Sequence, residues 1–280
     1  MPVWVLPAAA GLLGLLIGSF LNVVVWRVPR GESLLHDSHC PRCNAPIRPW
    51  QNVPVISWVI LRGRCAQCRA PISARYPLVE AGTGIAFALV VWWSGHAWGW
   101  ETLAGGGGAV RDWAAWLALA AYLWFAAVSI ALTLIDLDHQ RLPDAIVLPS
   151  LGVILVLLAA SSALVADWGQ LGSTLGGSAA LFLFYSLIVL VYPTGMGGGD
   201  VKLAPLVGAV LGFIGWGAVA VGAFAGFLIG AVVGLLLIAA KKAGRKTGLP
   251  FGPSMLVGAW VGIIWGEAMW GGYLRLVGFA

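Results

Sequence analysis

The chain has 280 residues, of which 60% are hydrophobic and only 10% are charged. Soluble domains carry about a quarter charged residues, so this composition excludes a water-soluble globular protein and indicates a chain whose main solvent is a lipid bilayer. The formal net charge of +5 resembles a nucleic-acid-binding signal, but the positions of the basic residues report membrane topology instead, and we expect no nucleic-acid partner.

Long apolar runs predict an all-α polytopic membrane protein with about eight transmembrane helices. No basic residue precedes the first run, so we interpret it as a retained helix with its N-terminus outside rather than as a secretory signal. The sixth run is short for a full crossing and is expected to be tilted, broken or paired with the seventh. The predicted spans are 3–26, 78–98, 113–135, 144–166, 173–192, 203–215, 217–240 and 252–274.

The basic residues predict the orientation of these spans. With the N-terminus outside, the cytoplasmic segments hold 8, 1, 1 and 4 Lys or Arg residues, which is 14 of the 16 in the chain. This bias follows the positive-inside rule, and the opposite orientation would violate it. The cytoplasmic segments are then 27–77, 136–143, 193–202 and 241–251.

Residues 28–77 contain all four cysteines and no apolar run of spanning length, which predicts a small cytoplasmic module between the first two spans. Cys40 and Cys43 form one C-x-x-C pair, and Cys65 and Cys68 form a second after 21 intervening residues. Two such pairs can place four thiolates around one tetrahedral Zn²⁺, whereas cytoplasmic disulfides are rare. Four thiolates leave no open position, so we expect structural zinc. The alternatives are free thiols or a redox pair.

Two acidic residues stand out, because carboxylates inside a bilayer are costly and are functional candidates by default. Asp136 follows the third span, and Asp200 ends a glycine run that precedes the sixth. Both lie at cytoplasmic span ends, so we expect them at one depth, where they can meet. Asp138 competes with Asp136 for this role. Residues two apart on a helix point to different faces, so we expect only one of them to point at a partner.

A pair of close carboxylates can hydrolyse an amide without a metal or a covalent intermediate. The two groups share one proton, so one can take a proton from water while the other donates to the peptide carbonyl. Glycines beside Asp200, which include Gly197 and Gly199, would let an extended substrate backbone approach. The alternative is a pair of solvated loop acids near the interface.

Other acidic residues have simpler interpretations. Glu80 follows Pro77 by three residues, which predicts a place in the first turn of the second span, where the helix dipole favours a carboxylate. A functional role for Glu80 stays open. Asp144 follows Pro143 and is expected to lie in the first turn of the fourth span. Glu267, in the last span, has no role that the sequence explains.

Several strings, taken together, resemble the prepilin peptidases, also called type 4 prepilin leader peptidases, of the membrane-embedded Gly-x-Gly-Asp aspartyl protease class. Any one string is modest evidence, but all of them occur in the family's order and cover nearly the whole chain. The strings are residues 18–33, the two cysteine pairs, residues 75–80, Asp136 with Pro143 and Asp144, residues 197–203 and residues 250–253.

The resemblance implies two activities at the bacterial cytoplasmic (inner) membrane. The first is cleavage of the basic leader of type IV prepilins or type II secretion pseudopilins after a glycine, at the cytoplasmic face. The second is N-methylation of the newly exposed residue, with S-adenosylmethionine as the methyl donor. The family motifs carry the catalytic roles to Asp200 and to Asp136, which stands seven residues before Pro143, in preference to Asp138.

The sequence does not show how S-adenosylmethionine is held, because no Gly-x-Gly-x-x-Gly string joins a strand to a helix. We hypothesise that the cysteine module and nearby acids, Glu80 among them, hold the cationic sulfonium or the substrate amine. Further candidate contacts of substrate or cofactor are Lys202, Gly197 and Gly199.

The chain therefore divides into a first transmembrane helix (1–27), a zinc-binding module (28–77) and a transmembrane aspartyl peptidase core (78–280), with prepilins or pseudopilins and membrane lipid as partners. One alternative is a peptidase without methyltransferase activity. Another is a zinc-binding transporter or sensor with the aspartates on an ion path, which would place acids at several depths rather than at one face.

Overall fold

The structure is a computed structural model, and it describes residues 2–35, 38–192, 196–241 and 250–278. Residues 193–195 and 242–249, which belong to two of the predicted cytoplasmic segments, lie outside the described residues. The chain forms two compact units, Met1–Trp100 and Glu101–Ala280. Within the described residues the regular structure is helical, as predicted, and extended pairing is limited to isolated bridges.

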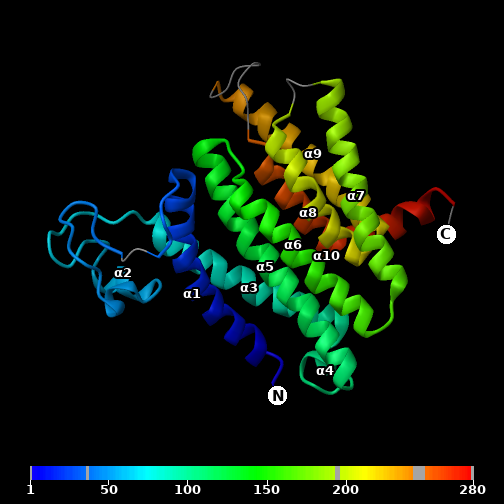
Figure 1. Cartoon of the computed structure of the whole chain (residues 1–280), viewed down its shortest axis with the longest axis horizontal. Helices are drawn as coiled ribbons and strands as arrows, with labels where there is room; N and C mark the ends of the chain where they lie inside the picture. Colours follow the sequence, from blue (N-terminus) through cyan, green and yellow to red (C-terminus); the bar gives the residue numbers. More distant parts are fainter. Residues whose placement is uncertain (1, 36–37, 193–195, 242–249, 279–280) are drawn as a thin grey trace. The chain divides into compact units, whose positions relative to one another are not determined.

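The first unit consists of two long helices and the cysteine module that connects them. Helices α1 (Val5–Arg27) and α3 (Arg75–Trp98) pack side by side (Figure 1). Glycines of α1 make this contact close. A Cβ atom on Gly14 would lie 2.7 Å from the Thr83 carbonyl oxygen, and one on Gly18 would lie equally close to α3. Small residues at such a contact are typical of membrane helix pairs, whose backbones approach without intervening side chains.

The second unit is a bundle with α8 at its centre. Helix α8 packs against α6, α7, α9 and α10, and the Tyr122 hydroxyl of α5 donates to the Val210 carbonyl of α8 at 2.8 Å. The short α4 (Trp100–Leu103) lies at the boundary between the two units. The bundle helices are α5 (Ala109–His139), α6 (Asp144–Leu164), α7 (Trp168–Val191), α8 (Gly198–Ile214), α9 (Trp216–Ala239) and α10 (Gly252–Leu276) (Figure 1).

Six helices in the described part of the chain are long and apolar enough to span a membrane, namely α1, α3, α5, α6, α7 and α9. Large apolar side chains on their outer faces are exposed, for example Phe224, Leu228 and Leu235 of α9. Contiguous apolar surface of this kind is not stable in water and is typical of surface that contacts lipid. The predicted multi-pass membrane protein is therefore confirmed.

The two remaining long helices correspond to the sixth and eighth predicted spans. Helix α8 has 17 residues and begins at Gly198, five residues before the predicted start at 203, because Asp200 and Lys202 interrupt the apolar run that marked it in the sequence. It is separate from α9, and Gly215 joins the two. Protein rather than lipid surrounds α8, so it does not need a long hydrophobic surface.

The expected position of Glu80 in the first turn of its span is wrong. Helix α3 begins at Arg75, two residues before Pro77, and has no acidic residue in its first turn. Pro is tolerated near a helix N-terminus, so it did not mark the first residue. Glu80 is buried, and its Oε2 accepts the Val55 N–H at 2.7 Å. A contact to the module therefore replaces the expected interaction with the helix dipole.

The structure gives Glu267 the role that the sequence left open. Its Oε1 accepts the N–H of Ala218, the third residue of α9, at 3.0 Å. The first N–H groups of a helix have no partner within the helix, so the Glu267 carboxylate caps α9. Asp144 lies in the first turn of α6, as expected.

We expect Gly208→Ala to destabilise the bundle. A Cβ atom there would collide with the Gly177 carbonyl oxygen and with Ser178 Cα, so α7 and α8 would have to separate, at a cost of about 1–3 kcal/mol. The measurement is the thermal unfolding temperature in detergent. Gly172→Ala in α7 is the matched control, because its Cβ meets nothing within 4 Å. Equal unfolding temperatures for the two variants would contradict this packing.

Candidate active site and metal centre

The two cysteine pairs fold into matching turns. The N–H of Asn44 donates to the Cys40 carbonyl at 2.9 Å, and the N–H of Arg69 donates to the Cys65 carbonyl at 3.1 Å. Asn44 and Arg69 follow the second cysteine of each pair and both have a positive φ, +54° and +56°. This left-handed residue reverses the chain so that both thiols of a pair face the same side.

The four thiols form one cluster within the first unit. Their sulfur atoms all lie within 4.8 Å of one another, and the Sγ atoms of Cys40 and Cys68 are 3.8 Å apart. A tetrahedral site with metal–sulfur bonds of about 2.3 Å has sulfur–sulfur edges of about 3.8 Å. The predicted grouping of the cysteines is confirmed, and the cluster has the size of a tetrathiolate metal site.

The surroundings shift the pKa values of the Cys40 and Cys43 thiols in opposite directions. The N–H groups of Cys43 and Arg42 lower the pKa of the Cys40 thiol to about 6. The Ala45 N–H also lowers the pKa of Cys43, but partial removal from water and the three other sulfurs outweigh it and raise that pKa to about 11. Four thiolates repel one another, so the cluster can ionise completely only around a cation.

The structure brings Asp136 and Asp200 together within the second unit. Asp136 lies in the last turn of α5, Asp200 lies in the first turn of α8, and both side chains are buried. They are close enough for the charge of Asp136 to act on Asp200. Asp200 Oδ2 accepts the Gly197 N–H at 3.3 Å, and the Gly252 N–H donates to Asp136. Within the described residues neither carboxylate has an ion-pair partner.

The helix ends around the pair leave no room for larger residues. A Cβ atom on Gly252, the first residue of α10, would lie 2.7 Å from Asp136 Oδ2 and 3.4 Å from Leu142. One on Gly199 would lie 3.2 Å from the Cβ of the same leucine. Leu142 therefore occupies the junction between the starts of α8 and α10, and the two glycines let these helix starts approach the carboxylates.

A cluster of three aromatic rings lies beside the carboxylates. Tyr185 of α7 stacks on Phe227 of α9, with ring centroids 5.5 Å apart, and Phe227 contacts Phe251 at 5.2 Å. Tyr185 is buried and close enough to Asp200 for electrostatic interaction. Phe251 immediately precedes Gly252, so this cluster fixes the start of α10. The sequence offered no reason to single out Tyr185 or Phe227, because each lies in an apolar run without a distinguishing motif, whereas Phe251 belongs to the string 250–253.

The other candidate residues have different surroundings. Asp138 is exposed, whereas Asp136 is buried. Lys202 Nζ pairs with both carboxylate oxygens of Asp144, at 2.8 and 2.7 Å, and both side chains are about half exposed. This pair connects the first turns of α8 and α6 two residues after Asp200. An exposed pair of this kind contributes at most about 1 kcal/mol to stability.

The fold and these two clusters define a multi-pass helical membrane protein with a tetrathiolate site in one unit and a buried carboxylate pair in the other. The chain belongs to the type IV leader peptidase family, whose sequence model matches residues 123–235. The bacterial peptidase A24 N-terminal domain matches residues 12–94. The family predicted from the sequence motifs is therefore confirmed.

Three relatives, each named prepilin leader peptidase/N-methyltransferase, illustrate the similarity. The protein of Neisseria gonorrhoeae is 37% identical, with 93% of this chain and 91% of the relative covered. The protein of Pseudomonas aeruginosa is 34% identical, with 96% and 93% covered. The protein of Aeromonas hydrophila is 34% identical, with 97% and 94% covered. No solved structure matches the chain.

We expect the purified protein to hold one metal ion per chain and Cys65→Ser to remove most of it, because three thiolates and a hydroxyl bind a soft metal less tightly than four thiolates. The measurement is metal content per chain by plasma mass spectrometry. Ser33→Ala, an exposed change in the same unit, is the control and should keep the metal. A full complement of metal in the Cys65→Ser protein would contradict the assignment.

Proposed function

We propose that the chain is a bifunctional prepilin peptidase and N-methyltransferase of the bacterial inner membrane. Its substrates are type IV prepilins or type II secretion pseudopilins, cleaved after a glycine and then methylated on the new N-terminus. The name that the relatives share, prepilin leader peptidase/N-methyltransferase, supports both activities. The structural observation that carries the peptidase half is the meeting of Asp136 and Asp200, buried and without an ion-pair partner among the described residues.

The carboxylate pair supports an aspartyl peptidase mechanism with Asp136 and Asp200 as catalytic residues. Two adjacent carboxylates cannot both ionise easily, so they hold one proton between them. The ionised group takes a proton from water as the water oxygen bonds to the scissile carbonyl carbon. The protonated group donates to the carbonyl oxygen, and the amide nitrogen then leaves with a proton. The N–H groups of Gly197 and Gly252 hold the two carboxylates in place.

The charge distribution supports cleavage at the cytoplasmic face. The segments that precede and follow the predicted spans on that side hold 14 of the 16 basic residues, and Asp136 and Asp200 lie at the helix ends that adjoin them. The basic leader of a prepilin stays in the cytoplasm, so its cleavage site reaches the same depth. In this proposal lipid surrounds the core (78–280) and the first helix (1–27), and the module (28–77) lies in the cytoplasm.

Zinc is the proposed metal of the thiol cluster. Four cysteine ligands at tetrahedral spacing are typical of structural zinc, and they leave no position open for a substrate. The module is short and has few buried apolar side chains, so metal binding would supply much of its folding free energy. In this proposal the zinc shapes the module and takes no part in cleavage.

S-adenosylmethionine is the proposed methyl donor, and when bound it supplies an electrophilic methyl group on a sulfonium. The peptide amine must be neutral to accept that methyl group, and the protein must hold a cationic cofactor. A zinc-binding transporter or sensor is the alternative of a different class. The meeting of both intramembrane aspartates at one depth, rather than their spread along a path, supports the peptidase.

We expect Asp136→Asn and Asp200→Asn each to lower prepilin cleavage by roughly a thousandfold or more, because neither variant can hold the shared proton. The measurement is leader removal from a full-length prepilin in detergent, followed by mass. Asp138→Asn is the matched control, since this exposed residue lies two positions from Asp136 on the same helix. If Asp138→Asn were inactive and Asp136→Asn active, the assignment would be reversed.

We expect Gly252→Ala to lower cleavage by roughly ten- to a hundredfold, because its methyl group would displace the Asp136 carboxylate from its position and small displacements of catalytic groups have effects of this size. The measurement is the cleavage rate at saturating prepilin. Gly271→Ala, in the same helix with no atom within 4 Å of its Cβ, should keep full activity. A fully active Gly252→Ala enzyme would show that the close approach does not matter.

A further inference from the structure

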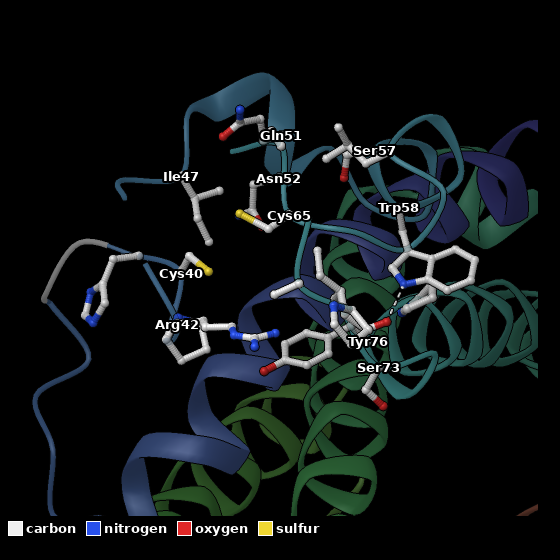
Figure 2. Close-up of a pocket in the computed structure, with 18 of the residues that line it drawn as sticks. Cys40, Arg42, Ile47, Gln51, Asn52, Ser57, Trp58, Cys65, Ser73 and Tyr76 are labelled. Carbon is white, nitrogen blue, oxygen red and sulfur yellow. Dashed lines mark hydrogen bonds between the residues drawn. The ribbon is translucent and has the colours of Figure 1, made fainter. Parts of the chain in front are cut away.

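The first unit contains a cavity of about 510 Å³ between the thiol cluster and the start of α3 (Figure 2). Its volume falls within the range of about 300–1,000 Å³ that is typical of small-molecule sites. Cys40 and Cys65 line one side, and Tyr76 and Glu80 of α3 line another. The four thiols group around one another, and neither Asp136 nor Asp200 lines the cavity, so no role described so far uses this space.

Besides the thiols of Cys40 and Cys65, the cavity lining holds one carboxylate, Glu80, and one guanidinium, Arg42. Glu80 of α3 is buried, and the Val55 N–H occupies only its Oε2, so its negative charge has a single backbone donor. Arg42 stands within the first cysteine pair and is exposed. Figure 2 shows the Arg42 guanidinium and the Tyr76 ring pointing toward one another across the cavity. A ligand with both a cationic and an anionic group suits this lining.

A fixed aromatic wall completes the cavity. The Trp58 indole Nε1 donates to the Ile72 carbonyl at 3.1 Å (Figure 2). Its ring packs against Gly63, where a Cβ atom would lie 2.8 Å from the ring. Both contacts hold the indole in one orientation before any ligand binds. Preformed aromatic surfaces of this kind bind flat heterocycles and attract cations.

We propose that this cavity binds S-adenosylmethionine, which rests on the proposed methyltransferase function. The cofactor carries a flat adenine, a sulfonium cation and an amino-acid carboxylate, and the cavity offers an aromatic wall, the Glu80 carboxylate and the Arg42 guanidinium. A buried carboxylate without a cationic partner among the described residues is costly, and a bound sulfonium compensates its charge. The same carboxylate therefore distinguishes the sulfonium of the cofactor from the uncharged thioether of its product.

The charge change during methyl transfer makes this discrimination useful. The peptide nitrogen bonds to the methyl carbon, the carbon–sulfur bond breaks with both electrons going to sulfur, and the nitrogen releases its proton to water. The sulfur is then an uncharged thioether, S-adenosylhomocysteine. Glu80 stabilises the sulfonium before transfer and loses that interaction afterwards, which favours release of the product.

Isothermal titration of the purified full-length protein with S-adenosylmethionine and with S-adenosylhomocysteine tests the proposal. Glu80→Gln keeps an oxygen for the Val55 N–H but removes the charge. It should weaken S-adenosylmethionine binding roughly tenfold, a typical effect of one charge-assisted contact, and leave S-adenosylhomocysteine binding within about twofold. Arg42→Gln should weaken both ligands by a similar factor, because both carry the carboxylate.

The controls are Glu32→Gln and Arg48→Gln, which change exposed residues of the same unit outside the cavity lining and should alter neither affinity. Metal content and prepilin cleavage should be unchanged in Glu80→Gln, and this result would show that the variant module is folded. If Glu80→Gln weakened both ligands equally, or neither, the cavity assignment would be overturned. The cavity assignment would also be overturned if S-adenosylmethionine were displaced by a pilin peptide with a free N-terminal amine and not by S-adenosylhomocysteine.

Failure of the cavity proposal can be distinguished from failure of the proposed methyltransferase function. If the unaltered protein cleaved prepilin but bound no S-adenosylmethionine, the methyltransferase half of the function and the cavity proposal would both be rejected, and a peptidase alone would remain. If the unaltered protein bound and used the cofactor while Glu80→Gln kept the same preference for it over the product, only the cavity proposal would fail.

Discussion

The close packing around α8 is the constraint on which the carboxylate pair depends. Gly177 of α7 and Gly208 of α8 bring their backbones into direct contact, and the Tyr122 hydroxyl joins α5 to the same helix. Because α8 is enclosed by protein, Asp200 at its start is buried among helices rather than exposed to lipid, where a carboxylate would be far more costly. A short, central, glycine-lined helix is therefore a physical requirement for placing an acid at this depth.

The sequence could predict those features that local spacing or solvent preference determines. Long apolar runs mark helices because lipid selects them, and the two cysteine pairs mark a thiol cluster because each pair folds as an independent turn. Asp136 and Asp200 were predicted to meet from topology alone, since both follow or precede spans on one side. The start of α8 was predicted too late, because polar residues near a buried helix end interrupt the hydrophobic pattern.

The remaining features depend on tertiary packing, which no local pattern contains. Tyr185 and Phe227 resemble any other aromatic residues of a span until the fold stacks them beside Asp200. Glu80 was misplaced for a similar reason. Its partner is the N–H of Val55, 25 residues earlier, where the chain adopts a φ of +61° that is unusual for a β-branched residue. The carboxylate holds this strained turn and so determines how the module joins α3.

The two units treat buried negative charge in different ways, and this difference explains how one chain can combine two chemistries. In the second unit, the described residues give Asp136 and Asp200 backbone donors but no ion-pair partner, so a proton shared between them is the available compensation, which suits hydrolysis of a neutral amide. In the first unit, the thiol cluster can ionise completely only around a cation, and Glu80, which lines the same cavity, has one backbone donor among the described residues. In the proposed cavity a cationic methyl donor would be compensated by Glu80, whereas beside the aspartates it would replace the proton that cleavage needs. Electrostatics therefore favours separate sites for the two proposed reactions.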